Sequence, residues 1–375
     1  MTDATPILQF GTSRFLQAHA DLFVSEALER GEALGRIAVV QTTDSADSAT
    51  RIAALADGAG YPVRVRGRHN GAVIDAEQRC HAVAAAFQAQ RDWRRLRDLA
   101  AGEVRVILSN TGDRGYHLDP ADGPSLLDQP DQAPRSFPAK LLVLLHHRWR
   151  NGAAPLSLFP CELVSRNGDQ LKRIVGDLAA AWGLPDAFLR YLSEDCRWAN
   201  SLVDRIVSEP LRPVGAVAEP YALWAIERQD GLTLPCTHPA IQLVDELAPV
   251  ERLKLHLLNL GHTWLADGWL REGRAPEETV FQAMNATAIR DDLEALWREE
   301  VLPVFAALGQ GAEAEAYRDS VRDRFLNPFL DHRLADIAQN HADKIQRRLA
   351  PVVALAADLS LSIPQARLRA ALTRL

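Results

Sequence analysis

The sequence predicts an α/β doubly wound domain followed by an all-α domain. Short apolar runs alternate with amphipathic segments up to about residue 245, which is typical of βαβ units and a parallel sheet. After about Pro249 almost all of the chain has helical periodicity. The length of 375 residues also suggests two domains. We therefore expect one domain over residues 1–245 and a second over residues 246–375.

Four strands are expected in the first domain. They are short apolar runs with turn-forming residues near their ends, as in strands buried on both faces of a parallel sheet. Further short strand-like runs mix with prolines between residues 200 and 245. The four expected strands are Ile7–Gly11, Arg36–Gln41, Val104–Leu108 and Leu156–Phe159.

Four helices are expected between and after these strands, because apolar residues recur there at helical spacing. They are Phe15–Arg30, Ala82–Ala101, Ser136–Trp149 and Gln170–Trp182, with an excursion loop over Pro120–Pro138. In the second domain we expect helix breaks near Gly268, Arg274 and the turn Gly309–Gly311.

Composition excludes several classes of protein. A formal charge of −7 argues against a nucleic-acid binder, which concentrates positive charge. No apolar run approaches the ~20 residues of a membrane span, and the first residues do not read as a signal peptide. The four cysteines are widely spaced, which favours free thiols in a reducing cytoplasm and predicts no metal site.

The segment Lys254–Thr263 is the most informative part of the chain. On an α-helix of about 100° per residue, Asn259 lies about 140° and His262 about 80° from Lys254, so all three share one half of an apolar helix. Such a set either satisfies a buried network or lines an active site. Because this helix opens the second domain, we expect it to face an interdomain cleft, where ligand sites prefer to lie.

The first strand leads through Gly11 into a helix, the order seen in Rossmann-like dinucleotide-binding domains. Glycine allows a tight turn and a close approach to a pyrophosphate, while the helix start supplies N–H donors. The usual motif has a second glycine two residues later, and Ser13 stands there. Gly11 alone is equally consistent with a simple turn.

Other candidate coenzyme contacts follow the second and third strands of this series. Asp44 could hold the adenosine ribose hydroxyls or be a solvated loop residue. No arginine immediately follows Gln41, which favours NAD over NADP. Asn110 and Thr111, at the carboxyl end of a strand, suit the nicotinamide side, although both are also common turn residues.

Lys-x4-Asn-x2-His resembles the catalytic helix of the mannitol dehydrogenase family of polyol-specific long-chain dehydrogenases. The resemblance implies a zinc-independent enzyme in which Lys254 is the general acid or base, Asn259 donates a hydrogen bond to the alkoxide and His262 orients the substrate or the lysine. These roles are chemically sensible, because desolvation lowers the pKa of a lysine and can make it neutral near working pH.

Further segments carry the resemblance. Leu8–His19 is similar to the family's glycine loop, which implies coenzyme contacts from Gly11, Ser13, Arg14 and Phe15. Asn200–Ile206 resembles a Val-Asp-Arg-Ile segment that implies substrate contacts from Asp204 and Arg205, although a structural pair is an alternative. Arg324–Phe329, followed by His332 and Lys344, resembles the family's C-terminal element and implies substrate contacts from His332 and Lys344.

The chain also departs from the family pattern. Ser13 replaces a glycine and Gln17 an arginine in the loop, and Arg14 could supply the missing charge. Leu163 stands where the family has an oxyanion-binding asparagine. Asp336 occupies the position of an arginine found in polyol-active members.

Scattered segments are most similar to the tagaturonate reductase (altronate oxidoreductase) branch. They are Ser136–Lys140, Glu219–Trp224 and Phe325–Ala338. The resemblance implies an NAD-dependent reductase of a keto sugar acid, such as tagaturonate or fructuronate, with its aldonate as product. Such a substrate needs a cation for its carboxylate, and Lys344, Arg205, His332 and Arg14 are candidates.

Two alternatives remain. One is a mannitol-type polyol or polyol-phosphate dehydrogenase. The other is a non-catalytic nucleotide sensor on the same fold, in which Ser13, Leu163 and Asp336 are decayed positions. The sequence leaves open the exact substrate, the preferred direction, and whether the chain is a monomer or a dimer.

Overall fold

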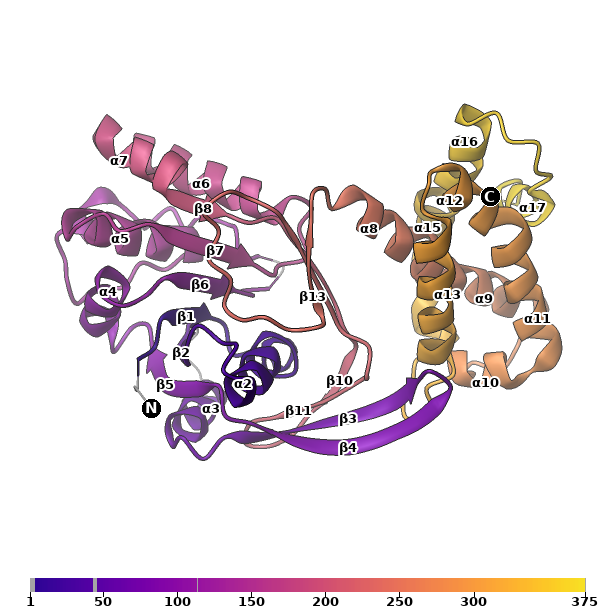
Figure 1. Ribbon diagram of the computed structural model, residues 1–375, viewed down its shortest axis with the longest axis horizontal. Helices are drawn as coiled ribbons and strands as arrows, with labels where there is room; N and C mark the ends of the chain where they lie inside the picture. The colour runs from indigo at the N-terminus through magenta and orange to yellow at the C-terminus, as the bar shows by residue number, and fades with distance from the viewer. Residues whose placement is uncertain (1–3, 43–45, 113, 375) are drawn as a thin grey trace. The chain divides into compact units, whose positions relative to one another are not determined.

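The computed structural model describes residues 4–42, 46–112 and 114–374 (Figure 1). The chain forms two compact units. The first comprises residues 1–64, 77–218 and 222–247, and the second residues 65–76, 219–221 and 248–375. None of the described helices is both long and apolar enough to cross a membrane.

A six-stranded parallel sheet forms the centre of the first unit, in the order β5-β2-β1-β6-β7-β8. The innermost strands are entirely apolar or nearly so and fully buried, as expected for a sheet covered on both faces. The strands are β1 (Ile7–Phe10), β2 (Ile37–Gln41), β5 (Val83–Gln88), β6 (Val106–Ser109), β7 (Leu156–Pro160) and β8 (Cys196–Trp198).

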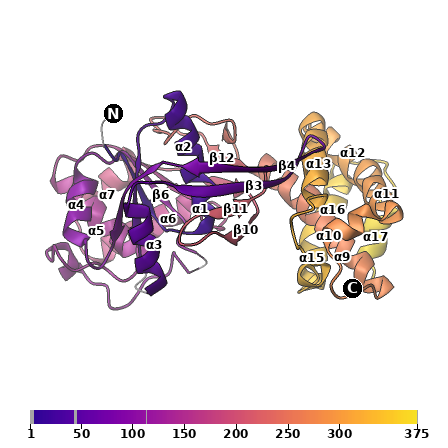
Figure 2. The same ribbon diagram turned by 90° about the horizontal axis from the view of Figure 1, so that it is seen from below.

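Helices cover both faces of this sheet (Figure 2). The strand order reverses direction between β1 and β6, and right-handed crossovers then place the helices before and after that point on opposite faces. One group is α1 (Arg14–Gln17), α2 (Ala20–Arg30) and α3 (Ala46–Ala56). The other is α4 (Trp93–Ala101), α5 (Phe137–Arg150) and α6 (Asn167–Ala181), in which α5 packs against both α4 and α6. A 3₁₀ turn (Pro124–Leu127) precedes α5, and α7 (Asp186–Arg190) and a π-turn (Tyr191–Asp195) follow α6.

Two smaller sheets complete the strand set. One has the order β10-β11-β3-β4 and the other β13-β12-β9. The tip of the β3–β4 hairpin, residues 65–76, belongs to the second unit. The strands are β3 (Tyr61–His69), β4 (Ala72–Cys80), β9 (Ser201–Asp204), β10 (Val207–Pro210), β11 (Ala216–Ala218), β12 (Leu223–Glu227) and β13 (Ile241–Val244).

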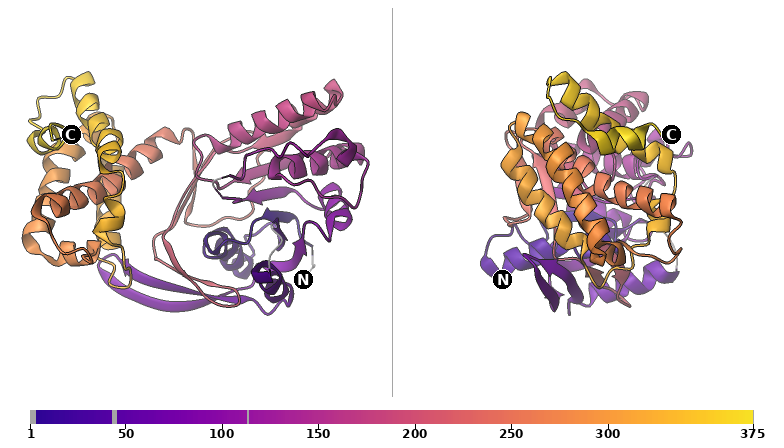
Figure 3. Two further views of the ribbon diagram at one scale, coloured as in Figure 1. Left: turned by 180° about the vertical axis from the view of Figure 1, so that it is seen from behind. Right: turned by 90° about the vertical axis from the view of Figure 1, so that its right-hand side faces the viewer.

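The second unit is mainly helical and has its own apolar core, which includes Trp297, Phe305 and Phe325. The last helices of the chain pack on earlier helices of the same unit (Figure 3). The helices are α8 (Ala248–Leu253), α9 (Leu260–Glu272), α10 (Val280–Asn285), α11 (Thr287–Leu296), α12 (Leu302–Ala307), α13 (Gly311–Phe325), α14 (Leu334–Ile337), α15 (His341–Arg348), α16 (Ala350–Asp358) and α17 (Ala366–Leu372), with π-turns at Lys254–Asn259 and Trp297–Val301.

The predicted fold class is confirmed, but some elements differ. The helix expected over Ala82–Ala101 is wrong in its first half, because Val83–Gln88 pairs with β2 as an edge strand and only Trp93–Ala101 is helical. Pairing in the sheet overrides the helix propensity of three alanines. The break expected at Gly268 is also wrong, since α9 continues to Glu272 and ends at Gly273.

Candidate active site

Gly11 lies where β1 ends, at the reversal point of the sheet. Its φ is +115°, and a Cβ there would lie 2.5 Å from the carbonyl oxygen of Asn110. Its N–H donates to the carbonyl of Val40 at 3.0 Å. Only glycine tolerates both this backbone conformation and this contact. The carboxyl ends of β1, β2 and β6 therefore meet around Gly11.

The next residues begin α1. Ser13 caps this short helix, and its hydroxyl accepts a hydrogen bond from the Leu16 N–H at 3.3 Å. A serine at this position is thus explained by capping, which glycine performs less well. Phe15 stacks on His19 with ring centroids 4.7 Å apart, and Arg14 is exposed.

Asn110 and Thr111 follow β6 and form hydrogen bonds to residues that follow β7. The Asn110 amide donates to the carbonyl of Cys161 at 2.9 Å. The N–H and hydroxyl of Thr111 both donate to Glu162, at 3.0 and 2.9 Å, and Ser109 donates to the other carboxylate oxygen. Buried Glu162 thereby ties two strand ends together at the edge where the glycine loop lies. Sequence reasoning gave it no role.

Two departures from the family pattern lie on the surface. The Leu163 side chain is 82% exposed, and Asp336 is exposed at α14. Neither residue is needed for packing. Within the described residues, Asn167 does not replace Leu163 as a donor, because its amide donates to the carbonyls of Pro160, Glu162 and Ser201.

Asp204 and Arg205 are buried at the end of β9. The Arg205 guanidinium donates to the carbonyl of Ala18 at 2.6 Å, just beyond the glycine loop. The structure thus uses Arg205 to hold the α1–α2 connection in the first unit. Asp44, predicted to bind the ribose, lies outside the described residues.

Lys254 and Asn259 are the first and last residues of a π-helical turn between α8 and α9. In such a turn the hydrogen bond joins residues five apart, so these two residues follow one another along the same face. The predicted angle of about 140° between Lys254 and Asn259 around the helix axis assumed an α-helix. It is wrong, because a π-turn includes one extra residue. π-turns of this kind occur frequently at functional sites.

His262 is buried one turn further along α9. Its ring centroid lies 4.3 Å from that of Phe325 and 4.7 Å from that of His332. Burial first, and then the charges of His332 and three basic residues, hold the pKa of His262 well below its ordinary value. The pKa of His332 is also lowered, mainly by burial. Both imidazoles are therefore neutral at neutral pH and can accept as well as donate hydrogen bonds.

Arg324, Lys344 and Arg348 supply the positive charges that act on His262, and we call them the cation cluster. Lys344 and Arg348 are four residues apart on α15 and share a face. The Lys344 ammonium donates to the carbonyl of Ile337 at 2.8 Å. Arg348 donates to the Thr263 hydroxyl at 2.9 Å and to the Asn259 carbonyl at 3.2 Å. The cluster therefore adjoins the Lys254–His262 segment.

Arg324 is buried and forms a bidentate ion pair with Glu219, at 3.0 and 2.8 Å, and lies over the ring of Tyr221. Asn327 accepts from the Phe329 N–H at 3.0 Å. These two residues have structural contacts, whereas Lys344 and Arg348 are only partly buried. Sequence reasoning missed Arg348, since nothing distinguishes it from the other basic residues of α15.

Family models account for nearly the whole chain. The mannitol dehydrogenase Rossmann domain matches residues 6–235, and the mannitol dehydrogenase C-terminal domain matches residues 246–372. The chain belongs to the mannitol dehydrogenase family.

Altronate oxidoreductases are among the curated proteins that are similar to this chain. That of Halalkalibacterium halodurans is 30% identical over 369 residues, covering 92% of this chain and 69% of the relative. That of Bacillus subtilis is 29% identical over 385 residues, covering 96% and 76%. The predicted resemblance to this branch is therefore confirmed at the level of sequence similarity.

Solved structures share the fold. A substrate-free D-sorbitol dehydrogenase has a TM-score of 0.81 and 21% identity, covering 96% of this chain and 77% of that one. The mannitol 2-dehydrogenase of Pseudomonas fluorescens, in a ternary complex with NAD and D-mannitol, has a TM-score of 0.70 and 18% identity, covering 99% and 80%.

The sequence predicts no metal site. Within the described part of this chain, no three His, Cys, Asp or Glu side chains are grouped to hold one. The four cysteines are free thiols, and all are buried.

Proposed function

We propose that the protein is an NAD-dependent oxidoreductase that interconverts a keto sugar acid, such as tagaturonate or fructuronate, with its aldonate. Membership of the mannitol dehydrogenase family and similarity to altronate oxidoreductases support hydride transfer at a secondary alcohol. The observation that carries the choice of a sugar acid is the pair of basic residues Lys344 and Arg348 on α15, because Arg348 donates to Asn259 and Thr263, on either side of His262 in the chain. A substrate carboxylate needs such charge, whereas a neutral polyol does not.

The first unit fits a dinucleotide. The glycine loop lies at the reversal point of a doubly wound sheet, where such folds bind their ligands. The positive φ of Gly11 and its contact with Asn110 bring the backbone of the loop to the strand ends without a side chain in the way. When bound, the nicotinamide supplies or accepts the hydride.

Lys254, Asn259 and His262 are the proposed catalytic residues. In the reducing direction the carbonyl carbon receives the hydride and its oxygen becomes an alkoxide, which takes a proton from the Lys254 ammonium. In the oxidising direction Lys254 removes that proton as a general base. The Asn259 amide has no hydrogen bond to any described residue, so it is available to donate to the alkoxide. Neutral His262 accepts or donates at a second hydroxyl.

Lys344 and Arg348 are proposed to hold the carboxylate. Arg348 is fixed by Thr263 and Asn259, so its guanidinium needs little ordering when an anion binds. His332 lies against His262 and is proposed to contact a substrate hydroxyl. Asp204 and Arg205 remain proposed substrate contacts by family resemblance.

The function is tested by following NADH oxidation with tagaturonate, fructuronate, fructose and fructose 6-phosphate. Turnover confined to a uronate supports the proposal. Turnover of fructose or its phosphate would instead identify a polyol or polyol-phosphate dehydrogenase. NADH binding without turnover of any of the four would favour a nucleotide sensor.

Lys254→Ala tests the mechanism. We expect kcat to fall by roughly 10²-fold or more, the usual contribution of general acid–base catalysis, with NADH affinity unchanged. Lys172→Ala is the matched control, because this lysine lies on α6 in the first unit and donates to the Ser193 carbonyl at 3.2 Å. Full activity of the Lys254 variant would end the proposed role of this lysine.

A further inference from the structure

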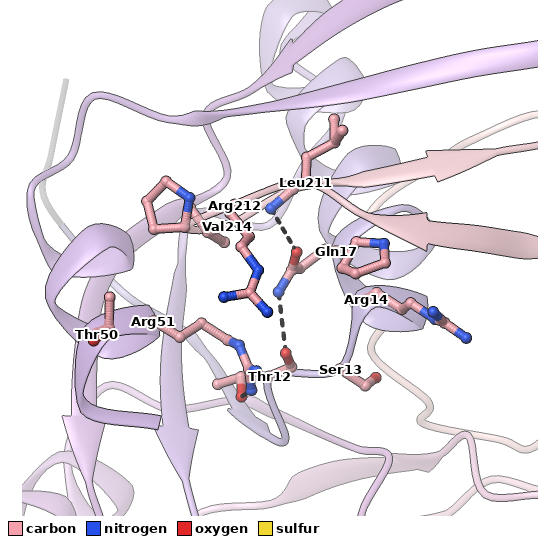
Figure 4. A pocket seen from close by; sticks show the side chains of 12 residues that line it. Thr12, Ser13, Arg14, Gln17, Thr50, Arg51, Leu211, Arg212 and Val214 are labelled. Atoms are coloured by element: carbon pink, nitrogen blue, oxygen red, sulfur yellow. Dashed lines mark hydrogen bonds between the residues drawn. The ribbon is translucent and has the colours of Figure 1, made fainter. Parts of the chain in front are cut away.

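A cavity of about 560 Å³ lies beside the glycine loop, within the first unit. Figure 4 shows its walls. One wall is the loop itself, from Thr12 to Arg14, with Gln17. A second is the side of α3, with Thr50 and Arg51, and the third is the β10–β11 turn, residues 210–215. No role was predicted for α3 or for this turn.

The cavity is positively charged in a chain whose net charge is −7. Its lining includes Arg14, Arg51 and Arg212, and none of the described residues that line it is a carboxylate. The described part of the chain shows no ion pair for Arg51 or Arg212. Arg51 donates to the Thr12 hydroxyl at 3.2 Å. In Figure 4 the guanidinium groups of Arg51 and Arg212 lie near Gln17 and Thr12, whereas Arg14 points away from them.

The β10–β11 turn that carries Arg212 is firmly held. Leu211 N–H donates to the Gly215 carbonyl at 2.9 Å. Gly215 has a φ of +129°, and a Cβ there would lie 2.4 Å from the Pro62 carbonyl oxygen. The Gly215 N–H donates in turn to the Gln17 side chain at 2.9 Å. Arg212 is therefore presented to the cavity by a turn with little freedom.

Gln17 explains why the positive charge of this cavity comes from Arg51 and Arg212. Its amide donates to the Thr12 carbonyl at 3.0 Å, while its oxygen accepts from Gly215. Gln17 is thus a brace between the glycine loop and the turn, where the family has an arginine. The expectation that Arg14 replaces that arginine is not supported by its direction in Figure 4.

The position of the cavity indicates what it binds. Thr12 is hydrogen-bonded to Gln41 at the carboxyl end of β2. In doubly wound dinucleotide-binding folds, the adenosine ribose lies at the end of this strand, and an arginine nearby accommodates a 2′-phosphate. Guanidinium groups match phosphate oxygens in geometry as well as charge.

We propose that Arg51 and Arg212 form a phosphate site for the adenosine half of the dinucleotide. The phosphate is either the 2′-phosphate of NADPH or the diphosphate common to both coenzymes. This inference rests on one part of the proposed function, namely that the first unit binds a dinucleotide coenzyme. If the site binds the 2′-phosphate, the protein uses NADPH as well as NADH. The arginine that holds this phosphate is then Arg51, which lies ten positions after Gln41 in the sequence and contacts the glycine loop at Thr12.

The test is equilibrium binding of NADH and of NADPH, followed by nicotinamide fluorescence, to the wild type, Arg51→Met, Arg212→Met and the double variant. We expect each single change to weaken binding about tenfold, the usual loss for one charge-assisted hydrogen bond. Arg51→Lys should restore part of the affinity. Arg173→Met is the control, because this arginine is exposed on α6.

The pattern of losses identifies the phosphate. Weakened binding of NADPH alone, with adenosine 2′,5′-bisphosphate competing better than ADP, assigns the 2′-phosphate. Equal weakening of both coenzymes assigns the diphosphate. Unchanged affinity of the double variant for both coenzymes would overturn the phosphate site. Because binding is measured without substrate, failure to turn over a sugar acid would contradict the proposed function and leave this inference standing.

Discussion

Asp21 is a carboxyl group buried in the first turn of α2, directly after the glycine loop. The Tyr61 hydroxyl donates to its Oδ2 at 2.7 Å, and its Oδ1 has no partner among the described residues. Burial raises the pKa of Asp21 from 3.8 to about 6, against the lowering effect of its hydrogen bond from Tyr61. The folded protein therefore holds the proton of Asp21 more tightly than the unfolded chain does.

This difference makes stability depend on pH. The contribution of Asp21 to the free energy of unfolding is fully present below pH 3.8, falls as the pH rises, and is lost above about pH 6. The full effect of about two pKa units corresponds to about 3 kcal/mol. When the pH falls from 8 to 5, only about one of these two pKa units contributes to the free energy of unfolding, which corresponds to about 1.4 kcal/mol.

Asp21→Asn removes the titration and keeps an oxygen to accept from Tyr61. We expect wild type to gain about 1.4 kcal/mol relative to this variant when urea unfolding is measured at pH 5 instead of pH 8. Asp177→Asn, at a side chain that is 73% exposed, should show no such change. A difference between wild type and Asp21→Asn that is the same at both pH values would refute the reasoning.

Two further substitutions test the site. Gly11→Ala forces a Cβ to 2.5 Å from the Asn110 carbonyl at a φ of +115°, so we expect a loss of about 1–3 kcal/mol in stability and weaker NADH binding in titrations. Gly176→Ala, at an open helical position, should not destabilise. Lys344→Met should raise the KM for a uronate about tenfold, as expected for one charged hydrogen bond, and leave the KM for a neutral ketose unchanged. Arg347→Met, at an exposed neighbour, should change neither KM.

The elements that sequence predicted correctly have strong local patterns. Mostly apolar runs predict β1, β2 and β7, because strands buried on both faces of a sheet tolerate few polar residues. The helix expected over Val83–Gln88 is wrong because alanine favours helices and only pairing with β2 makes this segment a strand. Strand β3 carries a usable signal in its sequence, because buried and less buried residues alternate from Tyr61 onward.

Sequence names candidate site residues but says less about their geometry. Spacing and family resemblance propose Lys254, Asn259 and His262, and their roles stay a prediction. The π-turn that aligns the first two leaves no mark in the sequence. Arg348 becomes informative only through its contacts with Thr263 and Asn259. A basic residue on a solvent-facing helix is common, and tertiary packing decides which one adjoins a site.

The most direct test of the account compares kcat/KM for NADH-dependent reduction of tagaturonate and of tagatose. The two differ in having a carboxylate or a CH₂OH group at one end, so their ratio isolates recognition of the carboxylate. We expect at least about a tenfold preference for tagaturonate, from one or more charged hydrogen bonds to Lys344 and Arg348. Equal values, or a preference for tagatose, would contradict a site built for a sugar acid.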